Sequence, residues 1–109
     1  NTEWLRDLSV SHTKIGNVEV ARGNGDAARA ANGKGLEIAE RLSQLDPENT
    51  QWLRDLIVSN VKLSEMEDQA IVRLQRALSL AQSMFERGKL KPADHWMVDE
   101  FQRSLKSLK

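Results

Sequence analysis

A fifteen-residue segment occurs twice in this chain of 109 residues, at positions 48 residues apart. NTEWLRDLSVSHTKI begins at Asn1 and NTQWLRDLIVSNVKL begins at Asn49, and ten of the fifteen positions carry the same residue. Unrelated segments of this length would share about one residue, since each residue type makes up roughly 5–8% of an average protein. Self-similarity at a period of roughly 20–50 residues is typical of folds made of stacked repeats. We therefore expect two copies of one structural unit.

Each copy shows the hydrophobic spacing of an α-helix. One stripe recurs at steps of four and three residues, formed by Trp4, Leu8, Ser11, Ile15 and Val18 in the first copy and by Trp52, Leu56, Ser59, Leu63 and Met66 in the second. Such steps bring side chains onto one face of a helix. We expect both stripes to pack into the core, the two tryptophans included, rather than to form a ligand cage.

Capping and turn residues set the expected helix ends. Asn1 and Asn49 are predicted N-caps, because a short amide oxygen accepts hydrogen bonds from the first helical turn. The turn at 23–26 is predicted to end the first helix, with Gly23 and Gly25 at positive φ and Asp26 capping the next helix. That second helix is expected over about 27–45, and the Asp-Pro pair that follows stops it.

The second copy is shorter than the first. GLEIAERL at 35–42 aligns with ALSLAQSM at 77–84, an offset of 42 residues, so six residues are missing around 64–69. Ser64 and Glu67 have the spacing of a capping box, which would begin a new helix and preserve a hairpin. Apolar residues also continue the stripe through this region, so one continuous helix is the alternative. We favour the broken hairpin.

A turn at 87–91 precedes the last segment, which we expect to form a capping helix. Pro92 suits a first helical turn, and Asp94 suits the positive end of the helix dipole. Trp96 is expected to face outward, opposite one apolar stripe formed by Met97, Phe101, Leu105 and Leu108. We therefore predict an all-α protein of about five helices, with a first repeat at 1–48, a second, contracted repeat at 49–86 and a capping helix at 87–109.

The segment IGNVEVARGNGDAARAANGKGLEI at 15–38 resembles the tetratricopeptide repeat, a helix–turn–helix unit. Small, turn and helix-stop residues stand where that family has them, namely Gly16, Gly23-Asn24, Ala28, Gly35 and Pro47. The resemblance covers 1–86, and 87–109 is similar to the C-terminal cap of such arrays. It implies a solenoid fragment of stacked α-hairpins, from the C-terminal part of an extended array of the type found in large multi-repeat bacterial proteins.

Two features depart from the family pattern. Gly16 is replaced by Ser64 in the second copy, where the turn is contracted. Asn32-Gly33 stands where the family usually has a large aromatic residue and a helix former. Because Asn-Gly favours turns and a helix-interior glycine costs about 1 kcal/mol relative to alanine, we expect a second helix that persists but is locally weak over 30–36.

Composition argues against several classes of function. Sixteen basic and sixteen acidic residues cancel, so no net field favours nucleic acid or an anionic membrane as a partner. The chain has no cysteine, and His12 and His95 are its only histidines, so we expect no metal site and no enzyme. No apolar run approaches the roughly 18 residues of a membrane span, and no signal-peptide pattern is present. We expect a cytoplasmic protein without a cofactor.

The resemblance also implies where a partner binds, because the first helix of each tetratricopeptide pair lines a concave groove. The residues placed there are Arg6, Val10, Thr13, Asn17 and Val20 from the first copy, and Arg54, Val58, Val61 and Glu65 from the second. Repeated valines favour a groove over a merely solvated face, and an arginine can hold a carboxylate bidentately. We expect a protein–protein interaction scaffold that binds a peptide or a helix in this groove.

A spacer or self-association element is the alternative function. The chain begins inside a repeat and lacks an initiator methionine, so we expect it to be a piece of a longer multi-repeat protein. Stacked repeats bury their core between neighbours, and about three are normally needed for stability. The outer face of the first repeat, with Leu5 and Ile38, is therefore expected to form a homodimer.

Overall fold

The computed structural model describes residues 2–65 and 70–108 and confirms the all-α class. Within those ranges there are five α-helices and one 3-10 turn, and no strand. The elements are α1 (Thr2–Ala21), α2 (Gly25–Leu45), α3 (Thr50–Ser64), α4 (Ala70–Glu86), η1 (Pro92–Asp94) and α5 (Trp96–Leu108).

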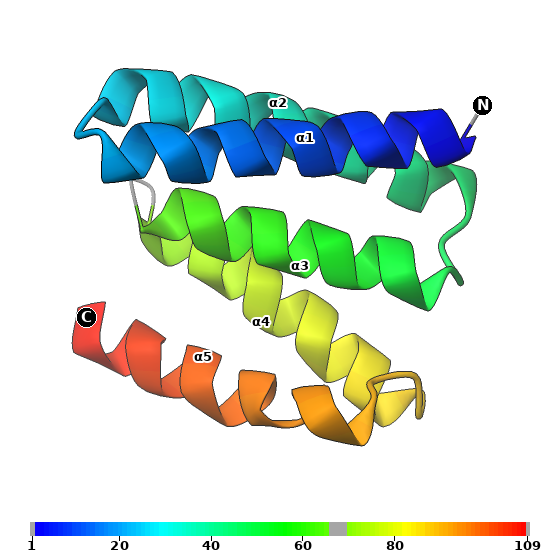
Figure 1. The fold of residues 1–109 in the computed structure, drawn as a ribbon. Coiled ribbons are helices and arrows are strands. Elements are labelled where there is room, and N and C mark those ends of the chain that lie inside the picture. Colours follow the sequence, from blue (N-terminus) through cyan, green and yellow to red (C-terminus); the bar gives the residue numbers. More distant parts are fainter. Residues whose placement is uncertain (1, 66–69, 109) are drawn as a thin grey trace.

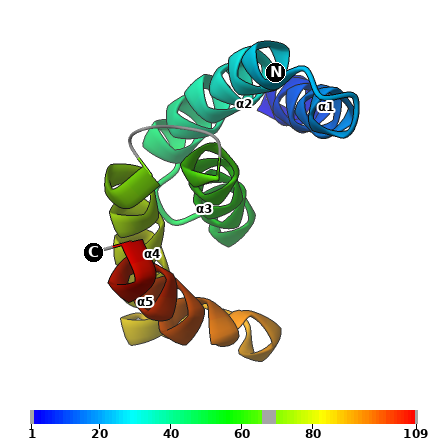
Figure 2. The ribbon, with the colours of Figure 1, turned by 90° about the vertical axis from the view of Figure 1, so that its left-hand side faces the viewer.

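The helices lie side by side in chain order (Figure 1). Each contacts the next, α1 with α2, α2 with α3, α3 with α4, and α4 with α5. Seen from the side, they form an arc in which α1, α3 and α5 lie on the inside and α2 and α4 on the outside (Figure 2). The three inner helices run in the same direction (Figure 1). The arc therefore has an inner surface built from parallel helices.

The second copy folds as a hairpin, as favoured from the sequence. α3 ends at Ser64 and α4 begins at Ala70, so the alternative of one continuous helix is wrong. Asn49 is the N-cap of α3, and its Oδ1 accepts a hydrogen bond of 3.0 Å from the backbone N–H of Trp52. The predicted cap at Asn1, Met66 of the stripe and the Glu67 half of the capping box lie outside the described residues.

The turn between α1 and α2 differs in one detail from the prediction. Gly23 has a φ of +80°, as expected, but Gly25 is already the first residue of α2. Asn24 therefore occupies the N-cap position, and the prediction of Asp26 as the cap is wrong. Asp26 lies inside the first turn of α2, where its negative charge favours the positive end of the helix.

Small residues allow α1 and α2 to approach closely. A Cβ on Gly16 would lie 2.3 Å from Nδ2 of Asn32, and a Cβ on Gly35 would lie 3.2 Å from the backbone oxygen of Ser9. Ser9 Oγ donates a hydrogen bond of 2.9 Å to the Gly35 carbonyl. Asn32, buried against Gly16, thus fills the space between the helices. α2 continues through Gly33 without a break, which confirms a persistent helix, while its local weakness remains a prediction.

Larger apolar side chains form the core of the other half. One buried cluster joins α3, α4 and α5 and contains Leu53, Ile57, Leu74, Ala77, Ala81, Met84, Leu90, Met97, Phe101 and Leu105. A second cluster joins α2 to α3 and contains Leu36, Ala39, Leu56 and Leu63. The hydrophobic core is therefore centred on α3.

The predicted core stripe is buried in one copy only. On α3, Leu56 and Leu63 are each 1% exposed. On α1, Trp4 is 61% exposed, Ile15 51% and Val18 53%, so their predicted core packing is wrong. The reason is that α2 covers this face of α3, whereas α1 lies at the edge of the arc and the described residues place no helix over the same face (Figure 2).

The C-terminal segment begins with a short 3-10 turn. Pro92 starts this turn rather than α5, which begins at Trp96. Met97, Phe101 and Leu105 are buried, whereas Leu108 of the same predicted stripe is 49% exposed. Trp96 is 54% exposed, and its outward orientation is confirmed. α5 therefore buries one face against α4 and leaves another beside the inner surface of the arc.

Candidate functional site: the concave groove

A groove follows the inner surface of the arc as a series of connected hollows. The largest apolar side chains at its centre come from α3 and α5, and polar side chains lie at the end where the inner helices begin. Arg54 lines three of the hollows and Val58 lines two, which joins them into one surface. We call this surface the concave groove.

The hollow between α1 and α3 contains several residues predicted from the sequence. It has a volume of about 250 Å³. The predicted residues that line it are Val10, Thr13, Arg54 and Val58. Both valines are half-buried, so each has a side chain accessible from the groove. The structure thus brings α1 and α3 groove residues together.

The hollow between α3 and α5 is the most apolar part of the groove. It has a volume of about 170 Å³, and its apolar lining comprises Ile57, Val58, Val61, Trp96, Met97 and Phe101. The rings of Trp96 and Phe101 meet edge to face with their centroids 6.1 Å apart. This contact holds the indole at the rim, where more than half of it is exposed. An apolar side chain of a ligand can pack between the indole and Val58.

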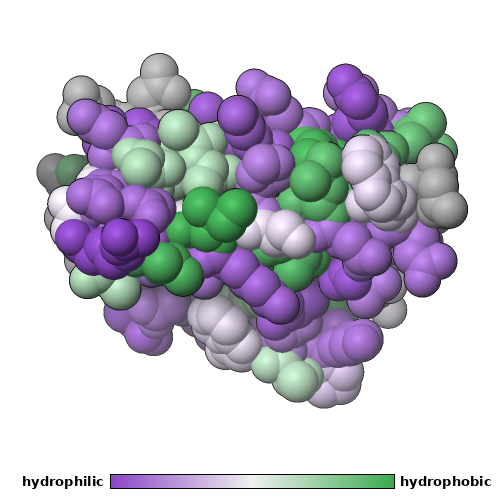
Figure 3. All heavy atoms as spheres, turned by 45° about the horizontal axis from the view of Figure 1, so that its top comes forward, coloured by the Kyte–Doolittle hydropathy of each residue, from purple (hydrophilic) through white to green (hydrophobic). Residues whose placement is uncertain are grey.

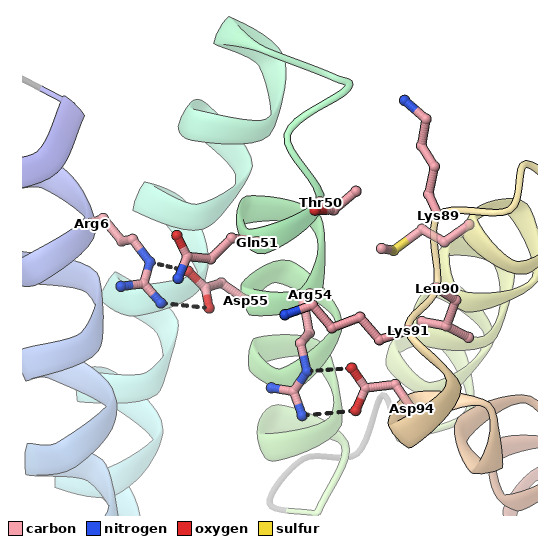
Figure 4. A pocket seen from close by; sticks show the side chains of 10 residues that line it. Arg6, Thr50, Gln51, Arg54, Asp55, Lys89, Leu90, Lys91 and Asp94 are labelled. Atoms are coloured by element: carbon pink, nitrogen blue, oxygen red, sulfur yellow. Dashed lines mark hydrogen bonds and ion pairs between the residues drawn. The ribbon is translucent and has the colours of Figure 1, made fainter.

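Two bidentate ion pairs cross the groove at its polar end (Figure 4). Arg6 of α1 holds Asp55 of α3, with Nε 2.9 Å from Oδ2 and Nη2 3.4 Å from Oδ1. Arg54 of α3 holds Asp94 of η1 in the same way, at 2.8 and 3.1 Å. Each predicted arginine therefore does hold a carboxylate, but the carboxylate belongs to this chain. Their first role is to link successive inner helices.

The two pairs differ in how their aspartates are buried, although the Arg54 side chain, at 45%, is more exposed than that of Arg6, at 30%. The Asp94 side chain is 10% exposed, compared with 23% for Asp55. The hydrogen bonds from Arg54 lower the pKa of Asp94 below its ordinary value of 3.8, although burial acts in the opposite direction. The same hydrogen bonds raise the pKa of Arg54. The pair therefore remains ionised at neutral pH.

Two lysines add positive charge to the polar end. Lys89 and Lys91 line the same cleft as the ion pairs, a hollow of about 520 Å³ (Figure 4). Lys89 also contacts Glu48, which binds Arg87 as well. These contacts lower the pKa of Glu48, chiefly through the hydrogen bond from Lys89. The ion pairs of Glu48 with Arg87 and Lys89 also join the connection between α2 and α3 to the connection between α4 and α5.

Acidic side chains lie at the opposite end of the groove. Glu65 and Glu100 line a hollow of about 610 Å³ together with Trp96. Of the remaining predicted residues, Asn17 accepts a hydrogen bond of 3.0 Å from Lys62, which links α1 to α3. Val20 lies one turn further along α1 and is 53% exposed.

Sequence reasoning missed part of the groove. Trp96, Phe101 and Asp94 come from the last segment, for which the sequence predicts only a capping role. The one available signal was the expected exposure of Trp96, since an exposed indole beside an apolar stripe is a feature of binding surfaces. The spacing within one helix could not show that α5 lies next to α3.

The described part of the chain offers no metal site and no membrane span. In residues 2–65 and 70–108, no group of three or more histidine, aspartate or glutamate side chains could hold a metal ion. None of the helices in those ranges is both long and apolar enough to cross a membrane. Comparison of the whole chain with protein-family models, with curated proteins and with solved structures finds no match.

Proposed function

We propose that this protein is a non-enzymatic interaction scaffold that binds a short peptide segment in the concave groove. The observation that carries the proposal is the apolar hollow between α3 and α5, in which Val58 and Val61 face a half-exposed Trp96. The tetratricopeptide resemblance leads to the same surface from the sequence. The hollow and the resemblance both support a ligand that lies on the inner helices.

The central hollow favours one large apolar side chain as the anchor. Tryptophan at an interface contributes a large apolar area and a polar N–H, and it is enriched among the residues that dominate binding energy. A leucine or phenylalanine of the ligand would pack on the indole and on Val58. The edge-to-face contact with Phe101 orders the indole in advance, which reduces the entropy lost on binding.

The opposite charges at the two ends of the groove favour one orientation of the bound peptide. Lys91 and the two bridged arginines lie at the polar end of the groove, and Glu65 and Glu100 lie at the other. Complementary charge steers a ligand and sets its orientation more than it raises affinity. The ligand is therefore a peptide with an acidic residue on the polar-end side of its apolar anchor.

A matched pair of substitutions tests this function. Peptides selected from a displayed random library would be measured by fluorescence anisotropy against the unaltered protein, Val58→Asp and Val72→Asp. Val72 lies on α4, outside the arc, and is 59% exposed, so the second variant adds the same charge away from the groove. We expect Val58→Asp to weaken binding at least about tenfold, because a hydrated carboxylate would replace the apolar surface on which the ligand packs.

The outcome separates a groove from a merely solvated face. Val72→Asp should bind selected peptides with unchanged affinity, and the selected peptides should share an apolar residue next to an acidic one. Circular dichroism of both variants verifies that the helices are intact. Peptides that bind equally well to Val58→Asp, or a selection that yields none, would contradict the proposed function.

Association through the first helix pair is a second candidate, as a spacer or self-association element of a longer protein. The exposed side chains of Trp4, Ile15 and Val18 favour it, because large apolar groups in one stripe are characteristic of a contact surface. Figure 3, in which this side of the molecule comes forward, shows hydrophobic patches among hydrophilic side chains. Leu5 and Ile38, which were expected to mediate a homodimer, are half-buried.

A further inference from the structure

The outer surface of α3 shows how one helix pair receives another. Leu56 and Leu63 of α3 pack against Leu36 and Ala39 of α2, and all four are buried. Ser59, on the same face of α3, is 6% exposed. This contact is made across the boundary between the two copies, since α2 belongs to the first and α3 to the second.

Polar links flank that apolar contact on one side. Asp55 of α3 accepts two hydrogen bonds from Arg6, and Lys62 of α3 donates one to Asn17. Both partners lie on α1. The first pair therefore contributes an arginine and an asparagine from its first helix, and a leucine and an alanine from its second.

α1 carries the same receiving residues as α3. The face of α3 is formed by Trp52, Asp55, Leu56, Ser59, Lys62 and Leu63, and the corresponding positions of α1 are Trp4, Asp7, Leu8, Ser11, Lys14 and Ile15. Five of the six are identical, and the sixth exchanges leucine for isoleucine. We call these six α1 residues the receiving face. Five of them, Trp4, Asp7, Ser11, Lys14 and Ile15, are exposed, and Leu8 is half-buried.

Several positions that face the second helix of the same pair differ between the two copies. Ser9 and Gly16 of α1, which approach α2 closely, correspond to Ile57 and Ser64 of α3. His12 corresponds to Asn60. Leu5 and Leu53 are the same residue, so the positions that pack internally are kept in part, whereas those at which α3 contacts its neighbour are identical at five of six. Duplication alone would not favour one face over the other.

We infer that the receiving face of α1 is a docking surface for a helix hairpin of the same kind as residues 2–45. The second helix of that hairpin covers Leu8 and Ile15 with a leucine and an alanine three residues apart, as Leu36 and Ala39 cover α3. Its first helix supplies an arginine to Asp7 and an acceptor to Lys14. The receiving face is separate from the concave groove, so this inference does not depend on peptide binding.

A second intact copy of this chain does not supply such a hairpin. The face of α2 that would dock is covered by α3, and the corresponding helix α4 is covered by α5. The occupant must therefore present an α2-like helix whose leucine and alanine are accessible. The template contact, α2 on α3, joins consecutive hairpins of one chain, so the occupant that we infer is a hairpin joined directly in front of α1, as α2 is joined to α3.

The test is a longer chain in which residues 1–48 are followed directly by residues 1–109. The junction joins Glu48 to Asn1, the same two residue types as Glu48–Asn49, so the connection and the N-cap are preserved. Leu8→Ala is made in the 109-residue part and, separately, in the 109-residue protein alone. We expect it to raise the unfolding equilibrium constant at least about tenfold more in the longer chain, as measured by urea denaturation.

Substitutions in the added hairpin provide the matched control. With Leu36→Glu in the added hairpin, Leu8→Ala should change the unfolding equilibrium constant of the longer chain only as much as it does in the 109-residue protein. Ala30→Glu adds the same charge at an exposed position of α2 and should leave the larger effect in place. Asp7→Asn in the 109-residue part should lower the denaturation midpoint of the longer chain and leave that of the 109-residue protein unchanged.

Two results would overturn the inference. One is an equal effect of Leu8→Ala in both chains, which would show that the added hairpin does not cover α1. The other is a dimer of the 109-residue protein, detected by sedimentation, that Leu8→Ala abolishes, because the receiving face would then pair with a different surface.

Discussion

Helices α1 and α3 share most of their first fifteen residues, yet they occupy different environments. Leu56 is almost completely buried on α3, whereas its counterpart Leu8 is only half-buried on α1. The stripe has the same period in both helices, and α2 covers it in only one of them. The comparison shows that a local pattern selects the face to be buried, and a neighbouring helix decides whether burial takes place.

The two helix pairs also differ in how they are held together. α1 and α2 approach closely at Gly16 and Gly35, where the buried Asn32 lies against Gly16 and Ser9 bonds to Gly35. α3 and α4 pack through Leu53, Ile57 and Leu74 in a cluster that extends to α5. Because α1 and α2 approach closely, added side-chain volume should destabilise the first pair. The second pair should be destabilised instead by the removal of side-chain volume from its apolar cluster.

The largest expected effect contrasts the same substitution at the two equivalent leucines. Leu56→Ala should lower the free energy of unfolding by about 2–5 kcal/mol, because it leaves a cavity in the α2–α3 cluster. Leu8→Ala in the 109-residue protein should cost about 1 kcal/mol or less, since that site is open to solvent. Urea denaturation followed by circular dichroism measures both. Equal losses would show that the faces of α1 and α3 are covered to the same extent.

A smaller effect is expected from adding one methyl group between α1 and α2. Gly16→Ala should lower the free energy of unfolding by about 1–3 kcal/mol, because the new Cβ overlaps the Asn32 amide. Gly33→Ala is the matched control, since nothing lies within 4 Å of the position that its new methyl group would take, and it should stabilise the helix by about 0.5–1 kcal/mol.

A double variant tests whether the loss in Gly16→Ala comes from steric overlap with Asn32 or from alanine at this position in general. Truncating Asn32 to alanine in the Gly16→Ala background should recover part of the loss, because it removes the overlapping amide. A Gly16→Ala protein as stable as the unaltered one would show that the first pair is not closely packed at this point.

The smallest expected effect compares the two arginine–aspartate pairs. Asp94→Asn should lower the free energy of unfolding by about 1–2 kcal/mol, a value reduced because the Arg54 side is partly exposed. Asp55→Asn should cost less, since that carboxylate is more exposed. Thermal denaturation of both variants at neutral pH measures the difference, and a larger loss for Asp55→Asn would contradict it.

The pH dependence of the same pair has a definite sign. Because the folded state lowers the pKa of Asp94, its contribution to stability is present above the ordinary value of 3.8 and is lost as the pH falls through the lowered value. The difference between the unaltered protein and Asp94→Asn should therefore be full at about pH 6 and shrink below about pH 4. A difference that grew on acidification would contradict the assignment.

The sequence was sufficient for much of the fold. Helical spacing, the cap at Asn49 and the turn at Gly23 predicted the helices and most of their ends. The six-residue deletion left two alternatives, and the favoured hairpin is the one observed. These features depend on interactions within a few residues along the chain, which a single sequence displays directly.

Features that depend on neighbours far along the chain could not be predicted. The exposure of Trp4 follows from the position of α1 at the edge of the arc, and the burial of Asp94 follows from its contact with Arg54. Trp96 joins the groove only because α5 lies beside α3. Periodicity assigns a side chain to a face of its own helix and contains no information about which helix is opposite.

The common direction of α1, α3 and α5 gives the inner surface a polarity of its own. The peptide dipoles of the three helices point the same way, so their positive ends gather where the arginine bridges lie and their negative ends gather near Glu65. Side-chain charges and backbone thus act in the same sense. A peptide bound along the arc would therefore be favoured in one orientation. In the reverse orientation, its acidic residue would lie near Glu65 and the negative ends of the helices, which repel it.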